Sequence, residues 1–203
     1  MTAPSADGLF DALPPIDEDT QQRLHTRLAA AAQRDGLLDI AYREIATPVG
    51  SLLLAATGQG LIRVAYESQG HDLALAALAA TVSPRILRAP ARLDEVARQL
   101  EEYFGGHRQR FDVPLDLRLA RGFRRSVLTH LPDIGYGHTE SYAQVAAAAG
   151  SPRAVRAVGT ACALNPIPVV VPCHRVIRSD GSPGEYAGGA AAKETLLRLE
   201  GAA

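Results

Sequence analysis

The chain has 203 residues, of which 47% are hydrophobic and 21% are charged, and its formal net charge is -1. This composition is typical of a soluble globular protein, and no apolar run is long enough to span a membrane. The segment Met1 to Phe10 lacks the basic stretch and apolar core of a secretory signal. The two cysteines, Cys162 and Cys173, exclude a disulfide framework and lack the partners of a zinc site. We therefore expect a cytoplasmic protein that uses no metal and no cofactor.

Charge is divided unevenly along the chain. Residues 1–120 carry 12 basic and 16 acidic side chains, a net of -4, whereas residues 121–178 carry 7 basic and 2 acidic, a net of +5. A locally positive segment suits a polyanionic partner. A random fluctuation with solvated arginines accounts for the same counts, so charge alone does not decide between the two.

Residues 1–36 are predicted to form an extension that precedes the first domain. Met1 to Pro15 is rich in Ala, Pro, Asp and Ser, a composition typical of disorder. Asp17 to Gln33 has acidic residues in its first turn and Gly36 just past its end, which predicts a helix. We find no chemistry in this extension.

Residues 37–118 are predicted to form a small domain around an antiparallel sheet. Three strand-like stretches are separated by short turns that contain glycine, which indicates a meander. These stretches are Asp39–Thr47, Ser51–Ala56 and Leu61–Glu67. Alanine-rich helical stretches follow near 71–81 and 91–104. Residues 111–117 are either a further strand or an extended linker.

Residues 119–203 are predicted to be mainly helical, so the fold class is α+β. Ser141 followed by Gln144 has the form of a capping box, which predicts a helix that runs through Ala149. Ser151-Pro152 then predicts the start of a second helix that continues to about Leu164.

The second of these helices has two distinct faces. Val155, Val158 and Cys162 recur with helical spacing and predict a buried apolar stripe, while Arg153, Arg156 and Thr160 lie on another face. A helix-turn-helix with a basic outer face of small residues is a DNA-binding shape. An ordinary helical hairpin with solvated arginines fits the same pattern.

The apolar run 167–171 predicts a short buried strand, at whose end lies Cys173, followed directly by His174. A strand end is a rigid mount for a nucleophile, and a neighbouring imidazole can help to form the reactive thiolate. Taken alone, a Cys-His pair is more often an inert buried cysteine beside a histidine. The flanking sequence reverses that judgement.

From about Gly122 to Gly201, the chain resembles the catalytic domain of the O6-alkylguanine-DNA alkyltransferases, also called methylated-DNA–protein-cysteine methyltransferases. The order and spacing of several motifs agree over roughly eighty residues, which is far more specific than any one motif. The matching stretches are Ser141-Tyr142, Ser151 to Gly159, Asn165-Pro166, Pro172 to Val176, Gly184 to Gly189, and Lys193-Glu194 through Glu200-Gly201.

The resemblance implies irreversible transfer of an alkyl group from O6 of guanine to the sulfur of Cys173, once per molecule. His174 would take the thiol proton, Glu200 would orient the imidazole, and Asn165 would hold the active-site turn. Tyr142 would form a hydrogen bond with the extruded guanine. Without the resemblance, Glu200 reads as a solvated acid at a helix end and Asn165 as a helix C-cap.

The resemblance also implies how damaged duplex DNA is bound. Arg156 would enter the base stack in place of the flipped guanine, and the helix-turn-helix would enter the minor groove. The DNA-binding set is Ser151, Arg153, Arg156, Ala157 and Thr160. The pocket for the flipped base would be formed by Tyr142, Val176, Tyr186, Ala187 and Gly188. We expect a monomer that associates with the nucleoid when it acts on DNA.

Two other functions remain as alternatives. A non-enzymatic binder of alkylated DNA that recruits other repair factors would use Arg156 and Tyr142 but would not need Cys173. A cysteine hydrolase would need an oxyanion hole and repeated turnover, and nothing in the sequence demands either. Stoichiometry separates the three, because only the transferase stops at one alkyl group per protein.

Overall fold

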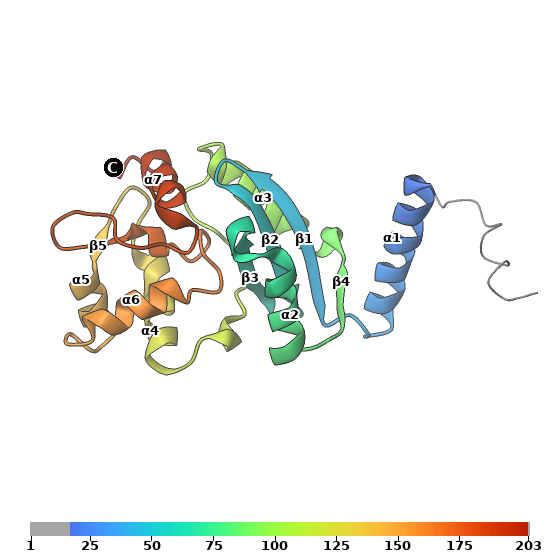
Figure 1. The fold of residues 1–203 in the computed structure, drawn as a ribbon, viewed down its shortest axis with the longest axis horizontal. Coiled ribbons are helices and arrows are strands. Elements are labelled where there is room, and N and C mark those ends of the chain that lie inside the picture. The colour runs from blue at the N-terminus through green and yellow to red at the C-terminus, as the bar shows by residue number, and fades with distance from the viewer. Residues whose placement is uncertain (1–16, 203) are drawn as a thin grey trace, which may run out of the picture.

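The computed structural model describes residues 17–202, so the disorder expected for Met1 to Pro15 lies outside the described residues. Figure 1 shows a helix at one end, a sheet with its helices in the middle, and a group of helices at the other end. The first helix, α1 (Glu18–Arg34), begins where expected, because the Asp17 carboxylate accepts a hydrogen bond from the Thr20 amide at 2.6 Å. It packs through Ala29 against the edge of the sheet.

The predicted antiparallel meander is confirmed. Strands β1 (Ile40–Thr47), β2 (Gly50–Thr57) and β3 (Gly60–Tyr66) pair in sequence, and the register places Thr47 opposite Gly50 across a tight turn. A short strand, β4 (Ile86–Arg88), adds parallel to β1, so the order is β3-β2-β1-β4. Strand β4 was not predicted from the sequence, because three residues are too few to show an alternating pattern.

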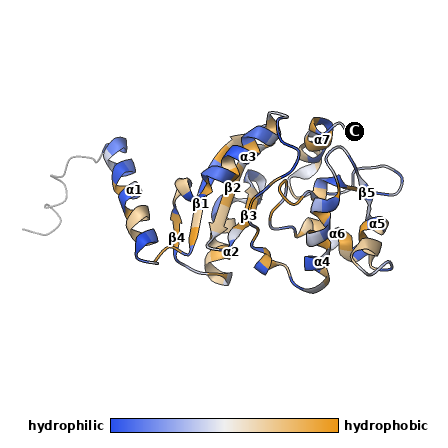
Figure 2. Cartoon of the chain, turned by 180° about the vertical axis from the view of Figure 1, so that it is seen from behind, coloured by the Kyte–Doolittle hydropathy of each residue, from blue (hydrophilic) through white to orange (hydrophobic). Residues whose placement is uncertain are grey.

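Helices cover both faces of the sheet. Leu52 and Leu54 share a core with α3 (Asp94–Phe104), whereas the alternate residue Ala55 packs with α2 (His71–Thr81). The central strand β2 is accordingly buried and apolar on both faces, and Figure 2 colours much of the sheet as hydrophobic. Residues 111–117 are largely an extended linker, which pairs with β3 through a single bridge between Leu115 and Leu61.

We propose that residues 37–118 form an N-terminal domain and residues 119–203 a C-terminal domain, the division expected from the sequence. The latter contains α4 (Gly122–His130), α5 (Tyr142–Ala148), α6 (Val155–Ala163) and α7 (Gly189–Leu199), with two-residue strands β5 (Glu140–Ser141) and β6 (Val176–Ile177). The capping box is present: the Gln144 amide donates to Ser141 Oγ at 3.3 Å, and the Ser141 amide donates to Gln144 Oε1 at 2.8 Å.

Three local predictions in this domain are wrong: the start of helix α6, the buried position of Val155 and the strand over 167–171. Helix α6 begins at Val155 rather than at Pro152, because the Ala154 amide bonds to the Ser151 carbonyl at 2.8 Å and closes a separate turn first. The inward stripe of α6 is therefore Val158, Ala161 and Cys162, while Val155 is 38% exposed.

The strand predicted over 167–171 does not form, so Cys173 is not at a strand end. Pro168 interrupts the segment, Pro166 and Pro172 flank it, and each proline lacks the amide hydrogen that a strand ladder would use. The run instead folds into a buried turn in which the Val171 amide donates to the Ile167 carbonyl at 2.9 Å. Val169 adopts a positive φ of 73°, a strained conformation for a β-branched residue that costs about 1–3 kcal/mol.

Candidate active site

One buried side chain ties the strained turn to the sulfur of Cys173. The Asn165 amide nitrogen Nδ2 donates to the Val171 carbonyl at 2.8 Å and to Cys173 Sγ at 3.1 Å. Its oxygen accepts a bond from the Ile167 amide at 3.0 Å. Asn165 thus closes the turn at both ends and points a donor at the sulfur, which is more than a helix cap does.

Cys173 opens a short 3-10 turn, Cys173–Arg175, and is only 2% exposed. Burial raises the pKa of its thiol to about 11, although the bond from Asn165 and the positive charge of Lys193 oppose that rise. The resting group at neutral pH is therefore the protonated thiol. A nucleophilic role needs a base nearby to remove that proton.

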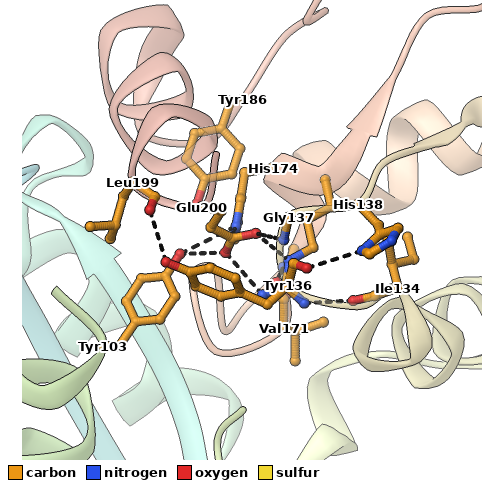
Figure 3. Close-up of polar contacts among 12 residues, drawn as sticks. Tyr103, Ile134, Tyr136, Gly137, His138, Val171, His174, Tyr186, Leu199 and Glu200 are labelled. Atoms are coloured by element: carbon orange, nitrogen blue, oxygen red, sulfur yellow. Dashed lines mark hydrogen bonds and ion pairs between the residues drawn. The ribbon is translucent and has the colours of Figure 1, made fainter. Parts of the chain in front are cut away.

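His174 has the properties of that base. Its ring is fully buried, and Nε2 lies 2.9 Å from Glu200 Oε1, so Nε2 carries the hydrogen and donates (Figure 3). The other nitrogen, Nδ1, is buried without a hydrogen-bond partner and keeps a free lone pair. Burial lowers the pKa of His174, an effect that Glu200 opposes only in part, so the imidazole is neutral at pH 7.

Glu200 follows the last residue of α7 and is 5% exposed, so it is not the solvated acid that its position at a helix end suggests. Its carboxylate also accepts bonds from Arg175 Nε at 2.8 Å, Arg175 Nη2 at 2.9 Å and the Tyr103 hydroxyl at 2.6 Å. Burial alone would raise the pKa of Glu200, but the donors from His174, Arg175 and Tyr103 hold it at about 2. The group therefore remains a carboxylate.

Beside the imidazole lies Tyr186, whose ring centroid is 6.2 Å from that of His174 in an edge-to-face arrangement. The Tyr186 hydroxyl is 2.9 Å from the hydroxyl of Tyr66, a residue of β3 in the N-terminal domain. Tyr66 also packs on Gly188, where an added Cβ would come within 2.5 Å of its ring. No larger residue fits there without moving Tyr66.

The remaining residues expected around a base pocket lie in the same region. Tyr142 begins α5 and is half-buried, and its hydroxyl would be 2.7 Å from a Cβ at Gly184, so glycine is needed there. Val176 is fully buried, and its carbonyl accepts a 2.6 Å bond from the ammonium of Lys193. Ala187 is partly exposed in the loop that carries Tyr186.

The residues expected to bind DNA share an outer surface. Ser151 is partly exposed in the turn before α6. Arg153 in that turn, together with Arg156, Ala157 and Thr160 on α6, is exposed. The structure thus presents the two arginines to solvent while Val158 and Cys162 of the same helix face the core.

Comparison with known proteins identifies the family. The sequence profile of the 6-O-methylguanine DNA methyltransferase ribonuclease-like domain matches residues 40–117, and that of the DNA binding domain of the same proteins matches residues 122–202. The chain belongs to the 6-O-methylguanine DNA methyltransferase family.

Individual methyltransferases match along most of their length. The methylated-DNA–protein-cysteine methyltransferase of Methanosarcina barkeri is 39% identical over 159 residues, which are 78% of this chain and 96% of the relative. That of Mycolicibacterium paratuberculosis is 40% identical over 161 residues, 79% and 92% of the two chains. The crystal structure of the Mycobacterium tuberculosis O6-methylguanine methyltransferase superimposes with a TM-score of 0.70 at 38% identity, covering 80% of this chain and 93% of that one. A structure of the same mycobacterial protein in complex with DNA gives 0.68, covering 79% and 92%.

Within this methyltransferase, sequence reasoning missed four residues at the site. Arg175 lies inside a recognised motif, but nothing local shows that its side chain turns toward Glu200. Tyr66, Tyr103 and Lys193 reach the site only through tertiary contacts. Across the described residues 17–202, no helix is long and apolar enough to cross a membrane, and no cluster of potential metal ligands is found.

Proposed function

We propose that the protein repairs O6-alkylguanine in duplex DNA by transferring the alkyl group to Cys173, once per molecule. Family membership supports this class of reaction. The observation that carries the assignment to these residues is the arrangement of Cys173, His174 and Glu200, in which a buried thiol is followed by a neutral imidazole backed by a carboxylate.

In the proposed step, the Cys173 thiol gives its proton to His174 Nδ1 through a bridging water, because Nδ1 has no direct partner. The thiolate attacks the alkyl carbon, the carbon–oxygen bond to guanine breaks, and a thioether forms. The electron pair of the broken bond stays with guanine, which takes up, through water, the proton that the thiol had passed to His174 and so becomes ordinary guanine. Tyr142 donates a hydrogen bond to the leaving base, and Glu200 stabilises the imidazolium while the proton is held there.

The lesion must leave the duplex to reach the sulfur, because Cys173 is almost completely buried. We assign the flipped base to a pocket formed by Tyr142, Val176, Tyr186, Ala187 and Gly188. Arg156 fills the vacated stack, and Ser151, Arg153, Ala157 and Thr160 follow the minor groove. We further propose that the protein acts as a monomer on nucleoid DNA. The reducing cytoplasm would keep its thiol free.

Arg156→Ala is expected to slow repair of duplex DNA by about tenfold or more, because the stack then loses the side chain that replaces the extruded base. Reaction with a free O6-alkylguanine base, which needs no extrusion, should be almost unchanged. The measurement is the single-turnover rate constant with each substrate. Arg125→Ala, which removes an exposed arginine of α4, is the charge-matched control. Equal losses on the two substrates would contradict the role of Arg156.

The proposed function is tested by intact mass after incubation with excess duplex that contains O6-methylguanine, followed by peptide mapping. One added methyl group, about 14 Da, on Cys173 is expected, with no further addition over time. A folded protein that binds the lesion without any mass change would favour the lesion-binding alternative. Continued consumption of substrate would favour a hydrolase.

A further inference from the structure

A tyrosine of the N-terminal domain is part of the buried network behind the catalytic pair. Tyr103 lies near the end of α3, is fully buried, and donates its hydroxyl to Glu200 Oε1 at 2.6 Å, across 97 residues of sequence. Figure 3 shows it entering from the sheet side while His174 and Glu200 come from the C-terminal domain. The same hydroxyl lies 3.5 Å from His174 Nε2.

Tyr103 and His174 compete for the same oxygen atom. Glu200 Oε1 accepts from Tyr103 at 2.6 Å, from His174 Nε2 at 2.9 Å and from Arg175 Nη2 at 2.9 Å. A carboxylate oxygen has limited lone-pair capacity, so the charge drawn by one donor is withheld from the others. The shortest of these bonds is the one to Tyr103.

We infer that Tyr103 is a positioning residue through which the N-terminal domain holds the Glu200 carboxylate and limits how strongly that carboxylate supports protonation of His174. This inference rests on the alkyl transfer proposed above. Tyr103 touches neither the sulfur nor the flipped guanine in this assignment, and it acts on His174 through the Glu200 oxygen to which both side chains donate.

The surroundings of the pair support an effect that is specific to the hydroxyl. The charged or titratable groups that face His174 and Glu200, taken from every element packed against them, are Cys173 and Arg175 of the 3-10 turn, Tyr103 of α3, Tyr136 before β5, Tyr186 before α7, and Lys193 of α7. Arg175 keeps Glu200 ionised even without Tyr103. The Tyr103 ring packs on Phe104, Phe111 and Tyr136, so a phenylalanine preserves the packing and removes only the donor.

The test is the pH profile of the first-order transfer rate in Tyr103→Phe, measured with saturating duplex that contains O6-methylguanine. The base must be neutral to act, so the rate falls on the acid side as His174 becomes protonated. Without the competing donor, Glu200 supports the imidazolium more strongly and the pKa of His174 rises. The acid limb is expected to shift to higher pH by about 0.5 to 1 unit. The transfer rate on the acid side should therefore fall by roughly three- to tenfold, while the rate on the plateau at higher pH should change little.

Tyr136→Phe is the matched control. The Tyr136 hydroxyl donates to the Leu199 carbonyl at 2.8 Å, one residue from Glu200, so this variant removes a tyrosine hydrogen bond at the same helix end and none of those that the carboxylate accepts. Its acid limb should coincide with that of the wild type. If the transfer rate of Tyr103→Phe is lower at every pH but its acid limb is not shifted, Tyr103 contributes only packing, and the inference is overturned.

Two further measurements keep the inference decidable. If Tyr103→Phe does not fold, 3-fluorotyrosine installed at position 103 keeps the ring and makes a stronger donor, and the acid limb should then move to lower pH; an unmoved limb overturns the inference. Titration of the His174 ring by NMR in wild type and variant needs no transfer. A wild type that never transfers would refute the proposed function, while an unchanged His174 titration would refute the role of Tyr103.

Discussion

Cys173→Ser is expected to abolish alkyl transfer while the protein still folds and binds DNA that contains the lesion. A serine hydroxyl can keep the hydrogen bond from Asn165, so the turn is preserved. An alcohol is a far weaker acid than a thiol, and His174 cannot generate its anion, so the rate should fall by at least about a thousandfold. Intact mass and binding anisotropy on the same duplex measure the two properties separately.

The matched control for that experiment is the other cysteine. Cys162 is buried in the inward stripe of α6, and burial raises the pKa of its thiol far above the ordinary value. Cys162→Ser should therefore retain transfer to Cys173 at close to the wild-type rate. A methyl group found on Cys162, or transfer that survives in Cys173→Ser, would contradict the assignment of the nucleophile.

Glu200→Ala is expected to lower the free energy of unfolding by about 3–5 kcal/mol and to remove most transfer activity. The substitution leaves the Arg175 guanidinium buried with two of its bonds lost, and it leaves the Tyr103 hydroxyl and His174 Nε2 without an acceptor. Urea denaturation at pH 7 measures the loss of stability. If the urea midpoint and slope of Glu200→Ala equal those of the wild type, the hydrogen bonds of Glu200 contribute nothing to the stability of the fold.

Glu200→Gln separates charge from shape, because the amide keeps one acceptor oxygen of similar size. The pKa of Glu200 is about 2 in the folded protein, below its ordinary value of 4.5. The ionised carboxylate therefore stabilises the fold at every pH above about 4.5. That contribution is lost as the pH falls from about 4.5 toward about 2. The stability gap between wild type and Glu200→Gln should accordingly be constant near neutrality and narrow over this acid window.

The features predicted correctly from sequence are those with local causes. The helix expected from Asp17, the Ser141–Gln144 capping box and the glycine turns of the meander depend on a few neighbouring residues, and each appears in the structure. The pairing of His174 with Glu200 came from a resemblance over eighty residues, and the structure places the two side chains in contact. Their catalytic roles remain proposals.

What could not be predicted depends on contacts between distant segments or on backbone strain. The run 167–171 has the composition of a strand, and only the prolines and the positive φ of Val169 show why it turns. Tyr66 and Tyr103 look like ordinary core aromatics of the N-terminal domain. Their hydroxyls meet Tyr186 and Glu200 only after the domains have packed, so no period or motif marks them.

The distribution of arginine and lysine also determines how the folded protein reacts with reagents that modify amines. Of its 21 basic residues, only Lys193 is a lysine, and its side chain is fully enclosed against the Val176 carbonyl. Acylating dyes, lysine crosslinkers and enzymes that attach ubiquitin-like tags therefore find no lysine on the folded surface. Acylation of Lys193 would accordingly report opening of the C-terminal domain, with the protein serving as its own unfolding probe.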